Sequence, residues 1–187
     1  MHQDQHEMQA RPPRPIPAKP ISHCFWVLPG RLLAGQYPGH EDEATAKARL
    51  DAFLAAGVRQ FVDLTGPEWP WLEPYAQHAG PARHWRSHIR DVSVPDHPSQ
   101  MKEILDTIDA ALERDDGVVY VHCWGGSGRT GLVVGCWLSR HGYPGAAALE
   151  KLAELWATNP KSRIPGKNCP NTDEQVDYVL TWREPQA

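Results

Sequence analysis

Residues 117–131 have the sequence GVVYVHCWGGSGRTG, in which an apolar run leads into a glycine-rich turn. The run predicts a buried strand, and the apolar residues 132–138 that follow the turn predict a helix. Glycines between a strand and a helix N-terminus let successive backbone N–H groups converge, and that arrangement favours an anion. The stretch therefore predicts an α/β fold that binds a phosphate group at the carboxyl edge of its sheet.

Three side chains of this stretch suit chemistry on a phosphate group. Cys123 ends the strand, and a helix N-terminus with a nearby cation can lower a thiol pKa from about 8.5 to roughly 3.5–7.5, which creates a nucleophile. Arg129 can donate to two phosphate oxygens at once, and Thr130 can donate toward the sulfur and stabilise the thiolate. We expect the substrate to be bound by Arg129 and by the residues between it and the cysteine: Trp124, Gly125, Gly126, Ser127 and Gly128.

The pattern His122-Cys123, five residues, Arg129-Thr130 resembles the signature of the cysteine-dependent protein tyrosine phosphatase superfamily. It is most similar to the compact dual-specificity branch that includes the kinase-associated phosphatases, and a fainter resemblance extends over most of residues 23–183. The resemblance implies a single α/β domain with a mainly parallel sheet flanked by helices. It also implies an enzyme that hydrolyses phosphotyrosine in proteins, with phosphoserine and phosphothreonine as further candidates, through a phosphocysteine intermediate and without a metal or other cofactor.

The family places an aspartate on a loop upstream of the cysteine strand, where it protonates the leaving oxygen. Asp91 follows a strand-like stretch in a setting similar to that of the family, and it is our prediction for this acid. Asp96 is the alternative, because it follows Val94-Pro95 and so resembles the Pro-Asp pair of the larger enzymes. It also suits a turn or cap ahead of the helix predicted from Ser99.

Three further residues have roles that the resemblance suggests. His122 is expected to orient the loop through hydrogen bonds rather than to transfer protons. Gln175, in Thr172-Asp173-Glu174-Gln175, resembles the residue that positions water in larger members, although the same residues fit a helix start with Asn171 or Thr172 as cap, and we prefer that interpretation. An oxidised Cys123 could pair with Cys24 or Cys169, as in some relatives.

The composition of the chain argues against several classes of protein. The chain has 187 residues, of which 41% are hydrophobic, and this suits one well-packed core. Its net charge of −4 argues against a nucleic-acid partner. No apolar run reaches the roughly 18 residues of a membrane span, no secretory segment follows Met1, and neither the cysteines nor the histidines have the spacing of a metal site. We expect a cytoplasmic protein without a metal.

The chain is expected to comprise a proline-rich N-terminal arm, 1–20, and a phosphatase domain, 21–187. A docking peptide is the alternative role for the arm. Hydrophobic periodicity predicts two strands that flank a Pro29-Gly30 turn within 25–34, further strands at 58–64, at 84–89 and before Cys123, and helices at 41–56, 72–78, 99–114, 129–141, 145–158 and 172–183.

Substrate choice and competing functions stay open at this stage. The turn after Cys123 lacks the lysines with which phosphoinositide phosphatases of the superfamily engage extra phosphates. Trp124 could flank an aromatic phosphoester, and Trp69 and Trp71 could form a rim, although packing explains each equally well. A phosphoprotein-binding pseudophosphatase is the main alternative, but it would lack the nucleophile or the arginine. A sulfurtransferase or arsenate reductase fits less well, because the motif lies late in the chain. The physiological substrate and the oligomeric state cannot be inferred.

Overall fold

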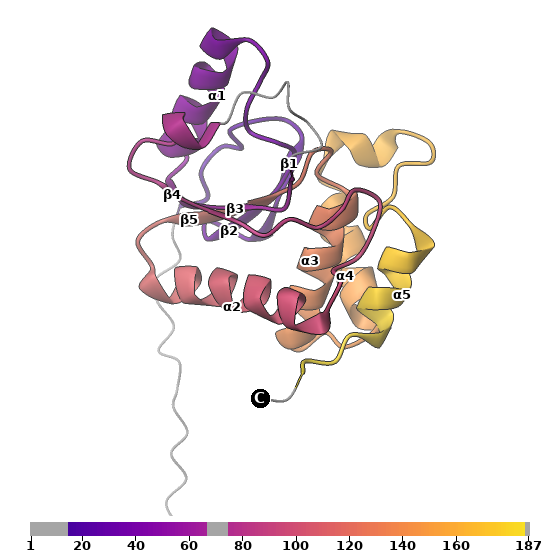
Figure 1. The fold of residues 1–187 in the computed structure, drawn as a ribbon. Helices are drawn as coiled ribbons and strands as arrows, with labels where there is room; N and C mark the ends of the chain where they lie inside the picture. Colours follow the sequence, from indigo (N-terminus) through magenta and orange to yellow (C-terminus); the bar gives the residue numbers. More distant parts are fainter. Residues whose placement is uncertain (1–14, 67–74, 186–187) are drawn as a thin grey trace, which may run out of the picture.

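Residues 15–66 and 75–185 are described by the computed structural model, and they form a central sheet with helices on both of its faces (Figure 1). The sheet has the strand order β1-β2-β5-β3-β4. β1 and β2 pair antiparallel, whereas all other neighbours are parallel. The strands are β1 (Cys24–Leu28), β2 (Leu32–Gly35), β3 (Val58–Asp63), β4 (Arg83–Arg86) and β5 (Val118–His122). This arrangement confirms the predicted α/β fold with a mainly parallel sheet.

The central position of β5 explains its sequence. It lies between β2 and β3, and each of its residues is buried. A strand that is covered on both faces needs a continuous apolar run rather than an alternating one, and 118–121 is such a run. The carboxyl end of this strand delivers Cys123 to the edge of the sheet where the parallel strands β2 and β3 also end.

The helices divide unequally between the two faces of the sheet. In Figure 1, α1 lies on one side and α2 to α5 lie on the other. The periodic apolar residues predicted for the helix at 99–114 are buried in α2, against β3 and β5. The helices are α1 (Glu43–Ala55), α2 (Pro98–Arg114), α3 (Gly128–Arg140), α4 (Ala146–Trp156) and α5 (Asp173–Thr181), with the 3-10 turns η1 (Tyr75–His78) and η2 (Pro160–Arg163).

Two predicted elements differ from the structure, and one was not predicted. The strand predicted at 84–89 is wrong beyond Arg86, because the chain leaves the ladder there and makes separate bonds from Ser87 N to Asp63 O and from Ile89 N to Leu64 O. The helix predicted at 72–78 is described only as η1, since its first residues lie outside the described part. The element that was not predicted is η2, which starts at a proline and follows an Asn cap. Hydrophobic periodicity does not reveal a turn this short.

Two remaining expectations concern the start of the chain and membranes. Most of the predicted arm, 1–14, lies outside the described residues; of its remainder, Lys19 donates from Nζ to the carbonyl oxygen of Thr158 at 2.8 Å. Across 15–66 and 75–185, none of the helices combines the length and the apolar character that crossing a membrane requires.

Candidate active site

Residues 123–129, which we call the phosphate loop, connect β5 to α3. The Cys123 side chain is buried at the start of the loop, and its sulfur accepts a hydrogen bond from the Gly126 amide at 3.3 Å. Gly126 has a φ of 75°, and a Cβ at this position would lie 2.4 Å from the backbone of both Gly35 and Gln36. A glycine is therefore required for the loop to fold back against the end of β2.

Arg129 lies in the first turn of α3 and is 1% exposed. Its Nη1 atom donates to the carbonyl oxygen of Ile89 at 2.9 Å and to that of Leu64 at 3.3 Å. These bonds hold the guanidinium group beside the ends of β3 and of the segment that follows β4. The structure therefore brings the arginine and the cysteine of the sequence motif to the two ends of one buried loop.

The two candidate acids have different surroundings. Asp91 Oδ1 lies 3.0 Å from Nη2 of Arg129, and the Asp91 side chain is 48% exposed. Asp96 instead lies 3.3 Å from Nη2 of Arg90, and both of these side chains are about 70% exposed. Of the two carboxylates, the structure thus places Asp91 beside the phosphate loop and Asp96 in a surface ion pair.

Thr130 makes a different contact from the one that the sequence predicts. Its hydroxyl group is fully buried and donates to the carbonyl oxygen of Gly35 at 3.4 Å rather than to the Cys123 sulfur. A hydroxyl group has one proton to donate, so the predicted bond to the sulfur requires this contact to be exchanged. In the arrangement that the structure shows, Thr130 ties α3 to β2.

His122 is fully buried and directly precedes Cys123. The Tyr75 hydroxyl lies 2.6 Å from Nε2, and burial raises the pKa of Tyr75 well above its usual value, so that the hydroxyl keeps its proton and donates. Burial also lowers the pKa of His122 to about 4, so the ring is neutral at physiological pH. Nδ1 then carries the ring proton and faces the carbonyl oxygen of Cys123 at 3.4 Å. These contacts agree with an orienting role for His122.

A buried carboxylate that the sequence did not indicate supports this histidine. Asp63 ends β3, is fully buried, and accepts hydrogen bonds from His84, Arg86 and Thr65 at 2.7–3.0 Å. Burial alone would raise its pKa, but the nearby His122 and these hydrogen bonds together lower it. Asp63 looked like the end of an ordinary strand in the sequence, and only the register that aligns it with His122 reveals its position.

Gln175 forms the helix start that we preferred over a role in positioning water. Thr172 and Gln175 form a reciprocal capping box at the N-terminus of α5, and the Gln175 side chain is fully buried. The same side chain also donates from Nε2 to the carbonyl oxygen of Ser93 at 2.9 Å, two residues beyond Asp91. The cap therefore connects α5 to the segment that carries the candidate acid.

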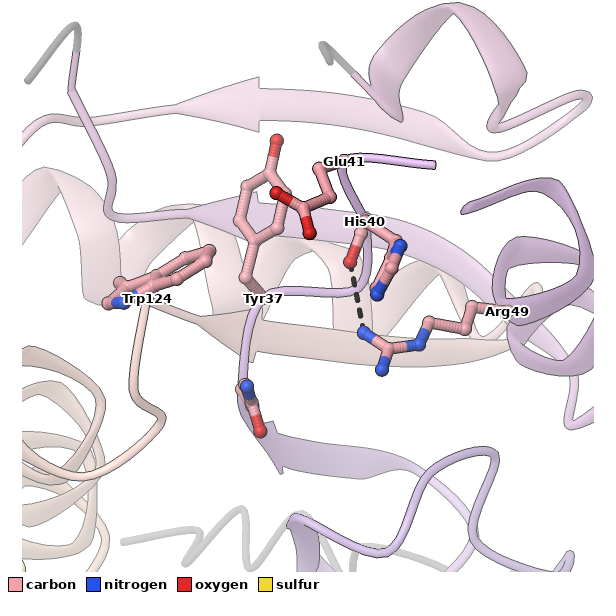
Figure 2. Close-up of a pocket in the computed structure, with 7 residues that line it drawn as sticks. Tyr37, His40, Glu41, Arg49 and Trp124 are labelled. Atoms are coloured by element: carbon pink, nitrogen blue, oxygen red, sulfur yellow. Dashed lines mark hydrogen bonds between the residues drawn. The ribbon is translucent and has the colours of Figure 1, made fainter. Parts of the chain in front are cut away.

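Trp124 lies at the edge of a cavity next to the phosphate loop, with a volume of about 330 Å³ (Figure 2). Its ring lies 5.8 Å from that of Tyr37, and Figure 2 shows His40 and Arg49 on the far side of Tyr37 from it. The cavity is lined by Gln36, Tyr37, Gly39, His40, Glu41, Arg49 and Trp124. Trp69 and Trp71, the other predicted rim residues, lie outside the described part of the chain.

Cysteines near the loop are unpaired. Cys169 Sγ donates to the Ser127 carbonyl oxygen at 3.4 Å, and Cys24 Sγ donates to that of Ile21 at 3.0 Å. Burial raises the pKa of Cys24 to about 11 and raises that of Cys169 as well. Both thiols are therefore protonated at neutral pH, and a disulfide with Cys123 stays a prediction. No group of three or more candidate metal ligands occurs within the described residues.

A lysine that the sequence analysis did not select also contacts the phosphate loop. Lys161, in η2, donates from Nζ to the carbonyl oxygen of Gly125 at 2.7 Å. It lies far from the motif in sequence, so no local spacing could indicate the contact. A lysine therefore contacts this loop without being part of its sequence, because the fold brings Lys161 to it from η2.

Comparisons with known proteins agree with this geometry. A family model described as "PTP-SAK: Swiss Army Knife protein, DSP-PTPase phosphatase domain" matches residues 21–175. The tyrosine-protein phosphatase CDC14 homolog of Schizosaccharomyces pombe is 37% identical over 89 residues, which are 48% of this chain. The match covers 16% of that relative, so most of its length has no counterpart in the comparison.

Two solved structures have a similar fold. The crystal structure of Tk-PTP in the active form has a TM-score of 0.63 and 25% identity, and the match covers 84% of this chain and 93% of that one. A crystal structure of kinase associated phosphatase (KAP) has a TM-score of 0.62 and 17% identity, with 79% of this chain and 83% of that one covered. The overall fold of the chain is therefore similar to those of these two phosphatases.

Proposed function

The chain belongs to the DSP-PTPase phosphatase family, and from this membership we propose that it hydrolyses phosphomonoesters of phosphoproteins through a phosphocysteine intermediate. One observation carries the proposal: Arg129 contacts Asp91 at 3.0 Å and begins the helix that closes the loop on Cys123. A nucleophile, a phosphate-binding cation and an acid therefore meet at one edge of the sheet.

In the first step, the Cys123 thiolate attacks phosphorus and a sulfur–phosphorus bond forms as the bond to the leaving oxygen breaks. The phosphate-loop amides and the Arg129 guanidinium group hold the nonbridging oxygens, whose negative charge must be stabilised in the transition state. Protonated Asp91 gives its proton to the leaving oxygen, which departs as a neutral alcohol or phenol. Asp91 is left as a carboxylate.

In the second step, a water molecule attacks the phosphocysteine. The Asp91 carboxylate removes a proton from this water, an oxygen–phosphorus bond forms, and the sulfur–phosphorus bond breaks. Inorganic phosphate leaves, Cys123 is again a thiolate, and Asp91 is again protonated. Thr130 assists if its hydroxyl exchanges the Gly35 carbonyl for the departing sulfur.

The ion pair between Asp91 and Arg129 belongs to the phosphate-free state in this proposal. A phosphate group carries about two negative charges and accepts two parallel hydrogen bonds from one guanidinium group, so it competes with a carboxylate for Arg129. Binding of substrate would release Asp91, which is half exposed and can then take up a proton. Substrate binding thereby prepares the acid.

Phosphotyrosine is the proposed preferred substrate, with phosphoserine and phosphothreonine as further candidates. The cavity beside Trp124 supports this preference, since an aromatic ring leaving the loop would meet aromatic surfaces there. A cytoplasmic location and a boundary between an arm, 1–20, and a catalytic domain, 21–187, are parts of the same proposal. The four unpaired cysteines fit a reducing compartment.

Hydrolysis of para-nitrophenyl phosphate in the presence of reductant and EDTA tests the proposal. We expect turnover by the wild-type chain that survives EDTA and is lost in Cys123→Ser, followed by release of phosphate from phosphotyrosine peptides. Folded, reduced wild type without turnover would overturn it. Tight phosphopeptide binding would then indicate a pseudophosphatase, and sulfur transfer from thiosulfate would indicate a sulfurtransferase.

A further inference from the structure

The phosphate loop has an outer side as well as an inner one. Where successive N–H groups turn inward to meet an anion, the carbonyl oxygens of the same peptide units turn outward, and these oxygens need partners if they are buried. Besides the Cys123 carbonyl, which faces the His122 ring, three carbonyl oxygens of the loop have the following donors. The Tyr37 amide donates to Trp124 O at 3.2 Å, Lys161 Nζ donates to Gly125 O at 2.7 Å, and the Gly131 amide donates to Ser127 O at 2.8 Å. Of these donors, Lys161 alone carries a charge.

The position of Lys161 is fixed by the short turn that carries it. Asn159 is 1% exposed, and its side chain accepts a hydrogen bond from the Lys161 backbone amide at 3.0 Å, which caps η2. Further along the same segment, Cys169 donates to the Ser127 carbonyl oxygen at 3.4 Å, and Asn171 packs against Gly128. Residues 157–172 therefore lie along the outer side of the loop, and the Lys161 side chain reaches Gly125 from this segment.

The charge of Lys161 is not neutralised by a neighbour. Within the described residues, no carboxylate lies within 4.0 Å of its Nζ, whereas Lys47, Lys102 and Lys151 each form an ion pair within their own helix. Residues 157–172 contain three basic residues and no acidic one, in a chain with a net charge of −4. The charge is therefore available to a negative group in the loop.

Electrostatics connects Lys161 with the nucleophile. Burial lowers the pKa of Lys161, the negative charge of Cys123 acts in the opposite direction, and the nearby Lys167 adds to the lowering. The attraction is mutual, so a charged Lys161 attracts negative charge in the loop. Tyr120 and Cys169 also lie near this sulfur, but burial raises the pKa of both, and they remain neutral.

We propose that Lys161 is a positioning residue of the phosphate loop, which holds the Gly125 carbonyl outward and adds a positive charge beside Cys123 and the bound phosphate. The inference rests on the proposed function in one respect, the use of Cys123 as nucleophile. A lysine satisfies both requirements, since a neutral donor would hold the carbonyl without adding charge.

Two substitutions test the two contributions together. Lys161→Met removes the donor and the charge, and Lys161→Arg keeps both. We expect Lys161→Met to lower kcat/KM by about 10-fold, as for loss of one hydrogen bond to a charged group, and to move the low-pH limb of the kcat/KM profile upward by about half a pH unit or more. Lys161→Arg should restore most of both. Lys167→Met, which removes a basic residue of the same segment that makes no contact with the loop, is the matched control and should change kcat/KM less than 2-fold.

Binding of inorganic phosphate to Cys123→Ser, with and without Lys161→Met, tests the same inference without turnover. We expect the double variant to bind phosphate about 10-fold more weakly. Unchanged phosphate affinity together with an unchanged low-pH limb would overturn the inference, as would an equal loss in Lys167→Met. If Lys161→Met does not fold by circular dichroism, failure of Lys161→Gln to bind phosphate more weakly than Lys161→Arg overturns it instead. An inactive wild type would overturn the proposed function, while the phosphate titrations would still decide the role of Lys161.

Discussion

The phosphate loop and the segment 87–97, which we call the acid loop, contribute to one site in different ways. The phosphate loop begins at a central buried strand, and its two reactive side chains, Cys123 and Arg129, are 3% and 1% exposed. The acid loop follows an edge strand, and its Asp91 side chain is 48% exposed. In the proposed mechanism, the half of the site that would bind phosphate is thus buried and held by packing, whereas the half that would transfer protons is partly exposed.

The contacts of the acid loop show how it is held. Its contacts include the ion pair between Asp91 and Arg129. They also include the hydrogen bonds that Gln175 donates to Ser93 O and that Arg129 donates to Ile89 O. Val92, between the acid and Ser93, has a φ of 52° and is 62% exposed. A β-branched residue in this region is strained, so the loop is kept in place against a backbone preference.

Arg129 is the residue that joins the two loops, and its replacement should have the largest effect. Arg129→Lys keeps a positive charge but loses the planar fork that can hold two phosphate oxygens, along with the contact to Asp91. We expect kcat/KM for a phosphotyrosine peptide to fall by about 100-fold or more. Steady-state kinetics on protein verified as folded measures this fall, and a loss below 5-fold would show that the fork is unnecessary.

The rigid half of the site should make stability depend on pH. His122 has a pKa of about 4 in the folded protein and 6.5 as its reference value, so the unfolded chain binds more protons between these values. The contribution of His122 to the free energy of unfolding is complete above pH 6.5. It is lost as the pH falls toward 4, and the total loss is roughly 3 kcal/mol. Urea unfolding at several pH values measures it. The dependence should flatten in His122→Gln, and an equal slope in that variant would assign the effect to other groups.

Gln175 connects α5 to the acid loop, and its loss should destabilise both. Gln175→Ala leaves the backbone amides of Asn171 and Thr172 and the carbonyl of Ser93 without this partner. We expect a loss of about 2 kcal/mol in the free energy of unfolding, measured by urea titration. Glu174→Ala, at the exposed neighbouring position, is the control. An equal loss in both variants would mean that the effect comes from the helix start alone.

Val92 should give the smallest effect and the clearest sign of strain. Val92→Gly removes the side chain that disfavours the positive φ, so we expect the free energy of the native acid loop conformation to fall by about 1 kcal/mol. The greater conformational freedom of glycine in the unfolded chain offsets part of this gain in stability. Thermal unfolding should show no loss of stability. A clear destabilisation of Val92→Gly would argue against strain at this position.

The sequence predicted the parts of the site that are continuous in the chain better than the parts that long-range contacts assemble, for a physical reason. The strand, turn and helix around Cys123 and Arg129 are continuous in the chain, so their local patterns are sufficient. Asp63, Lys161 and the Ser93 contact of Gln175 come from distant segments, and only the packing of the sheet brings them to the loop. The end of β4 was missed for a related reason, since bonds to the neighbouring β3 determine where the chain leaves the sheet.

The choice between Asp91 and Asp96 illustrates the limit of local patterns. Each follows a plausible motif in the sequence, and the structure distinguishes the two by their arginine partners, Arg129 for Asp91 and Arg90 for Asp96. Arg83, Arg86 and Arg90 show the same limit, since each lies in an ion pair with a carboxylate that only the folded chain brings near.

The measurement that tests the central claim most directly is the pH dependence of kcat for Asp91→Asn and Asp96→Asn with a phosphotyrosine peptide and with para-nitrophenyl phosphate. A general acid must be protonated, so the rate of the wild type should fall at high pH. We expect Asp91→Asn to lose this fall and to be impaired more with phosphotyrosine, the poorer leaving group, while Asp96→Asn matches the wild type. Loss of the high-pH fall in Asp96→Asn alone would contradict the account.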